Sequence, residues 1–142
     1  MTVDHILKGK GTGVVTLAPT HTMAEAAQLL ADRRIGALVV TDEQGRVTGI
    51  LSERDVVRAL AANGAAVLSH PVSRHMTAKV ETARRTDAIT ELMERMTHGR
   101  FRHLPIVEGE RLCGIISIGD VVKFRVAEME VETQAMRDYI TA

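Results

Sequence analysis

Apolar and polar residues follow one another along this chain in blocks that predict short helices and strands. Residues 23–34 carry apolar side chains at the spacing of a helix with one buried face. A short strand is expected before this helix, at 13–17, and two β-rich runs at 37–42 and 47–52 flank a glycine and predict a hairpin. A second helix should run over 53–62, because an Asn-Gly pair follows it. This stretch therefore predicts one β-α-β-β-α unit.

The same order of elements returns in the second half of the chain. Residues 79–83 are expected to form a strand and residues 88–98 a helix. Two further strands, 103–107 and 112–117, surround a glycine-containing turn, and a last helix begins at 118. The pattern predicts a second β-α-β-β-α unit.

The two halves also match residue by residue. Arg34 aligns with Arg100 at a shift of 66 residues, and the block 49–57 aligns with 114–122 at a shift of 65. One such unit is too small to bury a core alone. We therefore predict an α/β (α+β) fold in which two β-α-β-β-α repeats pack around a pseudo-twofold axis, with an extended C-terminal helix.

The repeat also suggests where the chain divides. The expected parts are a first repeat at 1–62, a linker and start of the second repeat at 63–79, a second repeat at 80–126, and a helical tail at 127–142. The match extends weakly into the preceding segments, since "VDHIL" at 3–7 resembles "VSRHM" at 72–76.

Composition restricts the possible partners. The 142 residues include 18 Lys and Arg against 18 Asp and Glu, so the net charge is zero and nucleic acid is not an expected partner. Cys113 is the only cysteine, which excludes an intrachain disulfide and suits a reducing compartment. No apolar run is long enough for a signal peptide or a membrane span. We expect a cytoplasmic protein that does not enter a membrane.

A Ser-x-x-Asp box occurs once in each repeat, where a strand becomes a helix. Ser52 with Asp55 and Ser117 with Asp120 have the spacing of a helix-capping box, which is one interpretation. The other is a ligand site, because a strand end beside a helix N-terminus suits an anion, and an ionised aspartate accepts bonds from both hydroxyls of a ribose.

A glycine lies three residues before each serine of these boxes. Gly49 and Gly114 have no side chain and would leave room for a flat ring against the strand. The capping and ligand interpretations are compatible, because the serine can cap the helix while the aspartate binds.

These motifs together resemble a known family. The duplicated "GILSERDVV" and "GIISIGDVV", with "RHLPIV" upstream of the second, are similar to tandem cystathionine-β-synthase (CBS) domains over residues 3–126. The resemblance implies a compact module with two clefts between the repeats. It also implies binding of an adenosine-containing ligand: AMP, ADP, ATP, NAD(H) or S-adenosylmethionine.

The resemblance assigns roles to particular residues. Aspartates of the box would hold ribose, the serines would lie beside them, and the polar residue of each first strand and the residues around "LPIV" would line the site. The ligand-binding residues so implied are Thr16, Gly36, Ala37, Ser52, Arg54, Asp55, Thr82, Arg102, His103, Pro105, Ser117 and Asp120. The second repeat has Arg102 and His103 where the first has the uncharged Gly36 and Ala37. The two sites are therefore expected to be unequal, with the second better suited to a phosphate and the ligand bound through Asp120 and its surroundings. In the first repeat, Arg54 is the alternative source of positive charge.

Other candidate motifs are weaker. "GKGTG" at 9–13 lacks the spacing of a phosphate-binding loop and is better explained as a flexible segment, although Lys10 remains within reach of a ligand. The six histidines form no metal-binding pattern, so no metal is expected. The sequence shows no nucleophilic side chain in a motif that pairs it with a general base, as a catalytic site would need. We therefore expect a non-enzymatic regulatory module that senses an adenosine ligand and reports to an unknown downstream protein. The alternatives are a structural adaptor with empty clefts and an enzyme acting on a nucleotide.

The tail has no counterpart in the first repeat. It carries a seam of apolar or near-apolar residues at heptad spacing: Val122, Val126, Met129, Thr133, Met136 and Ile140. Such a seam needs a surface to cover it, and CBS pairs commonly form dimers. We predict a homodimer in which the tail takes part. The alternative is a tail that folds back on its own module.

Overall fold

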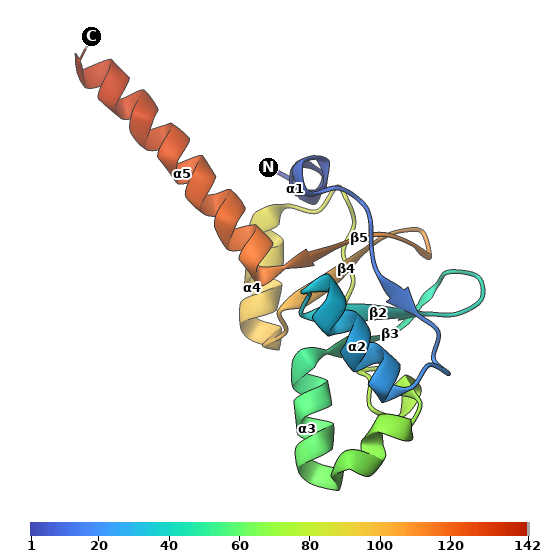
Figure 1. Ribbon diagram of the computed structural model, residues 1–142. Coiled ribbons are helices and arrows are strands. Elements are labelled where there is room, and N and C mark those ends of the chain that lie inside the picture. Colours follow the sequence, from blue (N-terminus) through green and yellow to red (C-terminus); the bar gives the residue numbers. More distant parts are fainter. Residues whose placement is uncertain (142) are drawn as a thin grey trace.

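The first half of the chain forms a small α/β unit with a three-stranded sheet. The computed structural model describes residues 1–141 (Figure 1). The elements of the first unit are β1 Thr16–Leu17, α2 Met23–Arg33, β2 Ala37–Thr41, β3 Val47–Ser52 and α3 Glu53–Asn63. The strand order is β1-β2-β3, with β1 parallel and β3 antiparallel to β2. The order of elements is the one predicted.

The second unit repeats this order with one strand fewer. Its elements are α4 Ile89–Gly99, β4 His103–Glu108, β5 Arg111–Ser117 and the long α5 Ile118–Thr141. The strand expected at 79–83 is wrong as a strand, because only Ala83 pairs with Ile106 in a single parallel bridge. The residues just before Ala83, Lys79–Glu81, line a cavity instead of extending the sheet. The prediction of two related repeats and an extended C-terminal helix is confirmed.

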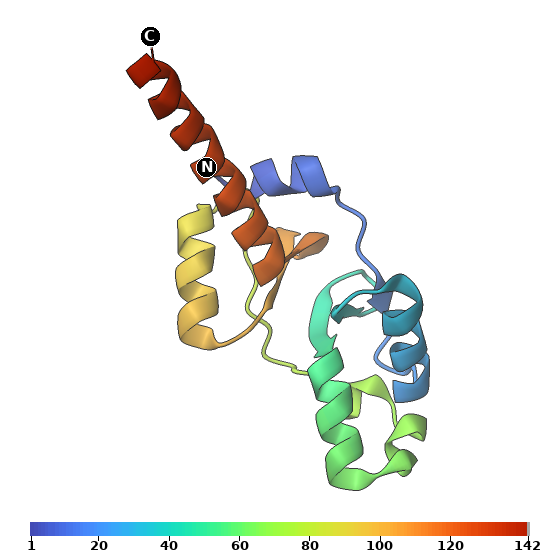
Figure 2. The same cartoon turned by 60° about the vertical axis from the view of Figure 1, so that its left-hand side comes forward.

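The segments that precede the two units exchange places. The N-terminal helix α1, Val3–Lys10, packs in the core of the second unit, where Val3 and Leu7 are fully buried beside Leu104 and Ile116. Figure 2 shows α1 beside the base of α5, away from the first unit. The predicted first repeat, residues 1–62, includes this segment, whereas the segment packs on the second unit.

The linker makes the reciprocal contact with the first unit. Its 3₁₀ turns, Ala65–Ser69 and Val72–Arg74, bury Val67 and Val72 in the core formed by α2, α3 and the first sheet. The Val3 amide donates to the Asp87 carbonyl oxygen at 2.9 Å, and the Val72 amide donates to the His21 carbonyl oxygen at 2.7 Å. These matching bonds follow the pseudo-twofold relation between the units.

The exchanged segments also fill the space beside the two strand glycines. A Cβ built on Gly49 would lie 2.3 Å from the Met76 sulfur, and one on Gly114 would lie 2.8 Å from a methyl of Leu7. The expectation that these glycines leave room for a flat ring is therefore wrong. They make room for an apolar side chain of the crossing segment.

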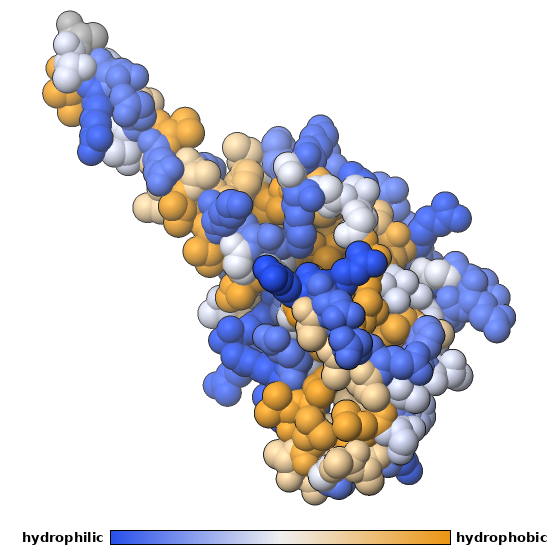
Figure 3. All heavy atoms as spheres, in the orientation of Figure 1, coloured by the Kyte–Doolittle hydropathy of each residue, from blue (hydrophilic) through white to orange (hydrophobic). Residues whose placement is uncertain are grey.

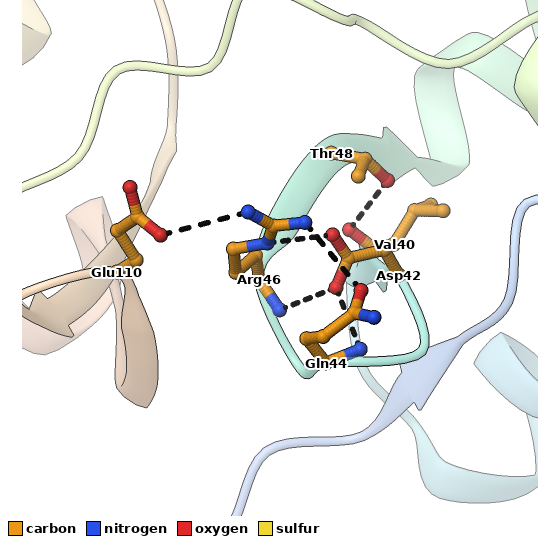
Figure 4. A network of polar contacts seen from close by, with 6 residues as sticks. All are labelled: Val40, Asp42, Gln44, Arg46, Thr48 and Glu110. Carbon is orange, nitrogen blue, oxygen red and sulfur yellow. Dashed lines mark hydrogen bonds and ion pairs between the residues drawn. The ribbon is translucent and has the colours of Figure 1, made fainter.

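The two hairpin turns lie next to each other and are joined by side chains (Figure 4). Asp42 accepts hydrogen bonds at 2.9 Å from the amides of Gln44 and Arg46, which close the turn between β2 and β3. Arg46 pairs with Asp42 at 2.9 Å and reaches Glu110 of the other turn at 3.7 Å. The hydrogen bond from the Arg46 backbone amide is the main reason that the pKa of Asp42 lies below its usual value. Desolvation of the carboxylate raises the pKa, but the hydrogen bond from the Arg46 side chain lowers it further. This contact ties the ends of the two sheets together.

The last helix leaves the body of the protein. Only Val121 of α5 is fully buried, and from Met129 to Thr141 every residue is exposed. Figure 1 shows α5 pointing away from both units. The tail therefore does not fold back on its own module; Ala142, the last residue of the predicted tail, lies outside the described residues.

Candidate functional site

Both Ser-x-x-Asp boxes cap the helix that follows them. In the first unit the Ser52 amide donates to Asp55 Oδ2 at 2.9 Å and the Asp55 amide donates to Ser52 Oγ at 3.2 Å. Ser117 and Asp120 form the same reciprocal pair at 2.9 and 3.1 Å. The capping interpretation is therefore correct for both boxes. It uses Oδ2 of each aspartate, so each Oδ1 is left for another donor.

Each box is also tied to the start of its sheet. The Glu53 amide donates to the Gly36 carbonyl oxygen at 2.9 Å, and the Ile118 amide donates to the Arg102 carbonyl oxygen at 2.8 Å. These bonds bring the first turn of α3 beside the start of β2, and the first turn of α5 beside the start of β4. The residues that the sequence singled out are thereby gathered at the ends of the two hairpins.

A cavity of about 690 Å³ lies between the two units at this place. This volume falls in the range of small-molecule sites, about 300–1,000 Å³. The first unit contributes Gly36, Ile50, Ser52, Glu53, Arg54, Asp55 and Arg58, and the rest of the wall is Thr77, Lys79, Val80, Glu81, Gly99, Arg100, Phe101, Arg102, His103, Ser117, Ile118 and Gly119. The cavity is thus built from both repeats.

Positive charge predominates on the cavity wall. Five cationic side chains line it: Arg54, Arg58, Lys79, Arg100 and Arg102. None of the five forms an ion pair with any acid among residues 1–141. The wall has three carboxylates, and one of them, Glu81, pairs with Arg95 at 2.7 Å. The wall can therefore offer several free cationic donors to an anionic ligand.

The starts of β2 and β4 approach each other closely at the cavity. A Cβ built on Gly36 would lie 3.3 Å from the His103 ring, so the absence of a side chain at Gly36 leaves space for this imidazole. Burial lowers the pKa of His103 below its usual value, and the nearby Lys10 ammonium adds to the effect. The imidazole is therefore neutral at neutral pH, with its ring at the wall of the cavity.

The second aspartate has a different environment. Lys10 Nζ lies 2.5 Å from Asp120 Oδ2 and donates to the Ile115 carbonyl oxygen at 2.8 Å. Burial raises the pKa of Asp120, but the hydrogen bonds from Lys10 and from the Ser117 amide outweigh it, and the pKa lies below its usual value. Asp120 therefore remains ionised and already holds a cation from its own chain.

The cavity gathers seven of the thirteen residues singled out from the sequence: Gly36, Ser52, Arg54, Asp55, Arg102, His103 and Ser117. The other six lie elsewhere: Lys10 and Asp120 in their ion pair, Thr16 exposed on β1, Ala37 and Pro105 buried in strands, and Thr82 beside the cavity-lining Glu81. The structure thus groups the first unit's aspartate with the second unit's Arg102 and His103.

Twelve of the nineteen wall residues were not singled out from the sequence, and four of them, Arg58, Lys79, Arg100 and Phe101, add cationic or aromatic groups to the site. Arg58 lies one helical turn after Arg54, and Arg100 is the repeat partner of Arg34. Lys79 follows Val72 by the seven residues that separate Lys10 from Val3, so the two lysines occupy matching positions. Phe101 directly precedes the Arg102-His103 pair. The repeat alignment was the signal for Lys79 and Arg100, whereas nothing in the pattern singled out Phe101.

Residues 1–141 contain neither a membrane-spanning helix nor a metal-binding cluster. No helix in this part of the chain combines the length and apolar character needed to cross a membrane. No group of three or more His, Cys, Asp or Glu side chains in the same residues is placed to hold a metal ion.

Comparison with known proteins places this geometry in a family. A CBS-domain protein from Agrobacterium tumefaciens is 50% identical to this chain and superposes with a TM-score of 0.85. The match covers 88% of this chain and 99% of that one. A CBS-domain protein from Pyrobaculum aerophilum, solved with AMP, is 28% identical with a TM-score of 0.79, over 94% of this chain and 99% of that one.

A third solved structure is a CBS domain pair in complex with 5′-methylthioadenosine and S-adenosyl-L-methionine. It is 25% identical to this chain and superposes with a TM-score of 0.81, over 90% of this chain and 98% of that one. The family model described as "CBS domain" matches twice, at residues 11–62 and 72–127. Since these matches cover most of the sequence, this chain belongs to the CBS-domain family and carries two CBS domains in tandem.

Proposed function

We propose that this protein is a non-enzymatic regulatory module that binds an adenosine-containing ligand in the cavity between its two CBS domains. The observation that carries the proposal is the cavity itself: the first unit contributes the capped Asp55 to its wall, and the second unit contributes Arg102, which forms no ion pair within residues 1–141. An aspartate oxygen suits the hydroxyls of a ribose, and a guanidinium suits a phosphate. The complexes of the two relatives, one with AMP and one with 5′-methylthioadenosine and S-adenosyl-L-methionine, support this ligand class.

The proposed mechanism follows from the position of the cavity. A ligand that contacts both units favours the arrangement in which they lie closest, by the difference in its affinity for the alternative arrangements. The relative position of the two units would then report whether ligand is bound. A downstream protein that contacts both units could detect this change.

A ligand panel tests the proposal. AMP, ADP, ATP, NAD, NADH and S-adenosylmethionine are added to the full chain, and the melting temperature is measured. A ligand at one hundred times its Kd stabilises the folded state by about 2.7 kcal/mol, so at least one should raise the melting temperature clearly. GMP serves as the matched control for phosphate binding without adenine. If no adenosine compound changes the melting temperature, the structural adaptor with an empty cavity is the better interpretation.

We also propose that the protein is a homodimer and that α5 takes part in the contact. Four apolar side chains of the seam are at least 48% exposed: Val126, Met129, Met136 and Ile140. Burying apolar side chains against a partner is favourable, because it removes their surface from water. Figure 3 shows apolar side chains along the projecting helix, with polar ones between them. A second copy of the same helix offers a matching seam.

Light scattering tests the dimer. The full chain should have the mass of two chains, and a double substitution, Met129→Glu with Met136→Glu, should return the mass of one. Both residues are exposed, so the substitutions leave the core of each unit intact. Asp138→Asn is the control, because Asp138 is exposed and lies on the face of the helix opposite the seam. A monomeric unmodified chain would refute the dimer, and an unchanged dimer in the double variant would exclude α5 from the contact.

A further inference from the structure

The cavity concentrates positive charge in a protein whose net charge is zero. Five of its 18 Lys and Arg residues line this one space. Three carboxylates face them, but Asp55 Oδ2 is engaged by the Ser52 amide and Glu81 is engaged by Arg95. The five cations outnumber the three carboxylates Glu53, Asp55 and Glu81, and none of the five is paired with an acid within residues 1–141. Cations held near one another repel, so an anion placed among them is stabilised.

The matching lysine of the other repeat shows what such a cation does when an acceptor is near. Lys10 pairs with Asp120, whereas Lys79 faces the cavity and forms no ion pair within residues 1–141. The first unit therefore keeps both members of the corresponding pair, Lys79 and Asp55, on the wall of the open cavity. Ribose hydroxyls would need the aspartate, and a phosphate chain would need the lysine.

We propose that this cavity selects its ligand by phosphate charge, and that it prefers ADP or ATP to AMP, to adenosine and to S-adenosylmethionine. The proposal rests on the function proposed above and names the ligand class of that site. Each added phosphate supplies negative charge and acceptor oxygens, which arginine binds in a bidentate manner and lysine as a point charge. The sulfonium of S-adenosylmethionine is itself a cation, and the five side chains would repel it.

Calorimetry on the full chain tests this selectivity. ATP, ADP, AMP and adenosine are titrated in the same buffer at low and at moderate salt. Each added phosphate allows further charge-assisted contacts with the arginines and Lys79, so ATP should bind about tenfold or more tightly than AMP. Salt should weaken ATP binding most and adenosine binding least, because screening acts on the phosphates.

Charge-removing variants connect the selectivity to the cavity. Lys79→Gln and Arg102→Gln should each weaken ATP binding about tenfold and leave adenosine binding unchanged. Arg111→Gln is the matched control, because Arg111 is exposed and lies at the far end of β5 from Ser117, about 20 Å along the strand. Tripolyphosphate should compete with ATP in the unmodified protein.

The outcomes separate this inference from the proposed function. AMP or adenosine binding as tightly as ATP would overturn the charge selectivity while leaving an adenosine site in place. An equal loss of ATP affinity in Arg111→Gln would also overturn it, since the effect would then be one of overall charge. Absence of binding by every adenosine compound would refute the proposed function itself.

Discussion

The two CBS domains place a lysine and an aspartate at matching positions, but the pairs differ in what they contact. In the second domain Asp120 holds Lys10 at 2.5 Å, and the lysine comes from the N-terminal helix that packs there. In the first domain Asp55 and Lys79 both line the cavity, and Lys79 has no acidic partner within residues 1–141. We call the second box closed, because its aspartate is paired with a lysine of the same chain, and the first box open, because its aspartate and lysine both line the cavity.

The difference shows that the box alone does not make a ligand site. Both boxes cap their helices with nearly the same bond lengths, so the local backbone is equivalent. What differs is the segment that crosses over from the other half of the chain. In the second domain this segment places Lys10 on Asp120, so the charge of the aspartate is already paired. In the first domain it leaves Lys79 on the cavity wall, and both Lys79 and Asp55 stay available to a ligand.

The largest effect should come from removing the anchor of the crossing helix. Leu7 is 1% exposed and packs on Gly114, whereas its counterpart Met76 packs on Gly49 and is only half-buried. Leu7→Ala should lower the free energy of unfolding by about 2–4 kcal/mol, and Met76→Ala by about half as much. Urea unfolding of both variants measures the difference. Equal losses would mean that the two crossing segments are anchored equally and that the asymmetry is confined to the lysines.

The fold was largely predictable because two signals agreed. The helical and alternating patterns defined the elements, and the repeat showed that the same unit occurs twice. The exchange of the leading segments was not predictable in the same way, since an apolar Val3 or Leu7 does not indicate which of two similar cores will bury it. The strand expected at 79–83 is reduced to a single bridge at Ala83, because Lys79, Val80 and Glu81 line a cavity that only the packed pair of units creates.

A second prediction compares the two aspartates directly. Asp55→Asn keeps an oxygen that can accept the Ser52 amide but loses the charge, and it should weaken ATP binding about tenfold. Asp120→Asn should change ATP binding less than twofold, because Asp120 does not line the cavity. Calorimetry at constant pH measures both, with melting curves as the check on folding. If Asp120→Asn weakens binding as much as Asp55→Asn, the closed form takes part in binding after all.

The candidate site was predictable in its motif and less so in its grouping. Sequence comparison pointed to Asp120 with Arg102 and His103, because all three belong to the second repeat. The structure instead places Arg102 and His103 across the cavity wall from the first repeat's Asp55. A cavity at a pseudo-twofold interface is built from both repeats. Residues that are near in sequence belong to one repeat, so their spacing alone does not show which residues of the other repeat face them.

A third prediction concerns His103, whose counterpart in the first repeat is the buried Ala37. Burial and Lys10 hold the pKa of His103 below 6.5 in the free protein, and a bound phosphate would raise it. Binding would then take up a proton, so ATP affinity should rise about threefold as the pH falls from about 7.5 to 5.5.

Comparison with His103→Gln removes the titration of the nucleotide itself, because that contribution is the same for both proteins. The variant should lose the extra gain at low pH. An identical pH dependence in the variant and in the unmodified protein would show that His103 does not contact the phosphates.

The smallest effect should come from opening the closed pair. Lys10 and Asp120 are 34% and 24% exposed, so solvent screens their attraction and the pair is worth no more than about 1 kcal/mol. The pKa of Asp120 is lowered below 3.8 in the folded protein, so this contribution is present above pH 3.8 and is lost as the pH falls through the folded-state value. Lys10→Met should therefore be less stable than the unmodified protein at pH 7, and the difference should disappear in acid. Lys79→Met is the matched control and should cost nothing at either pH, because Lys79 has no ion pair to lose. Urea unfolding at pH 7 and near pH 3 measures all three proteins, and a loss in Lys10→Met that is independent of pH would mean that packing of the lysine stem, and not its charge, holds Asp120 in the closed form.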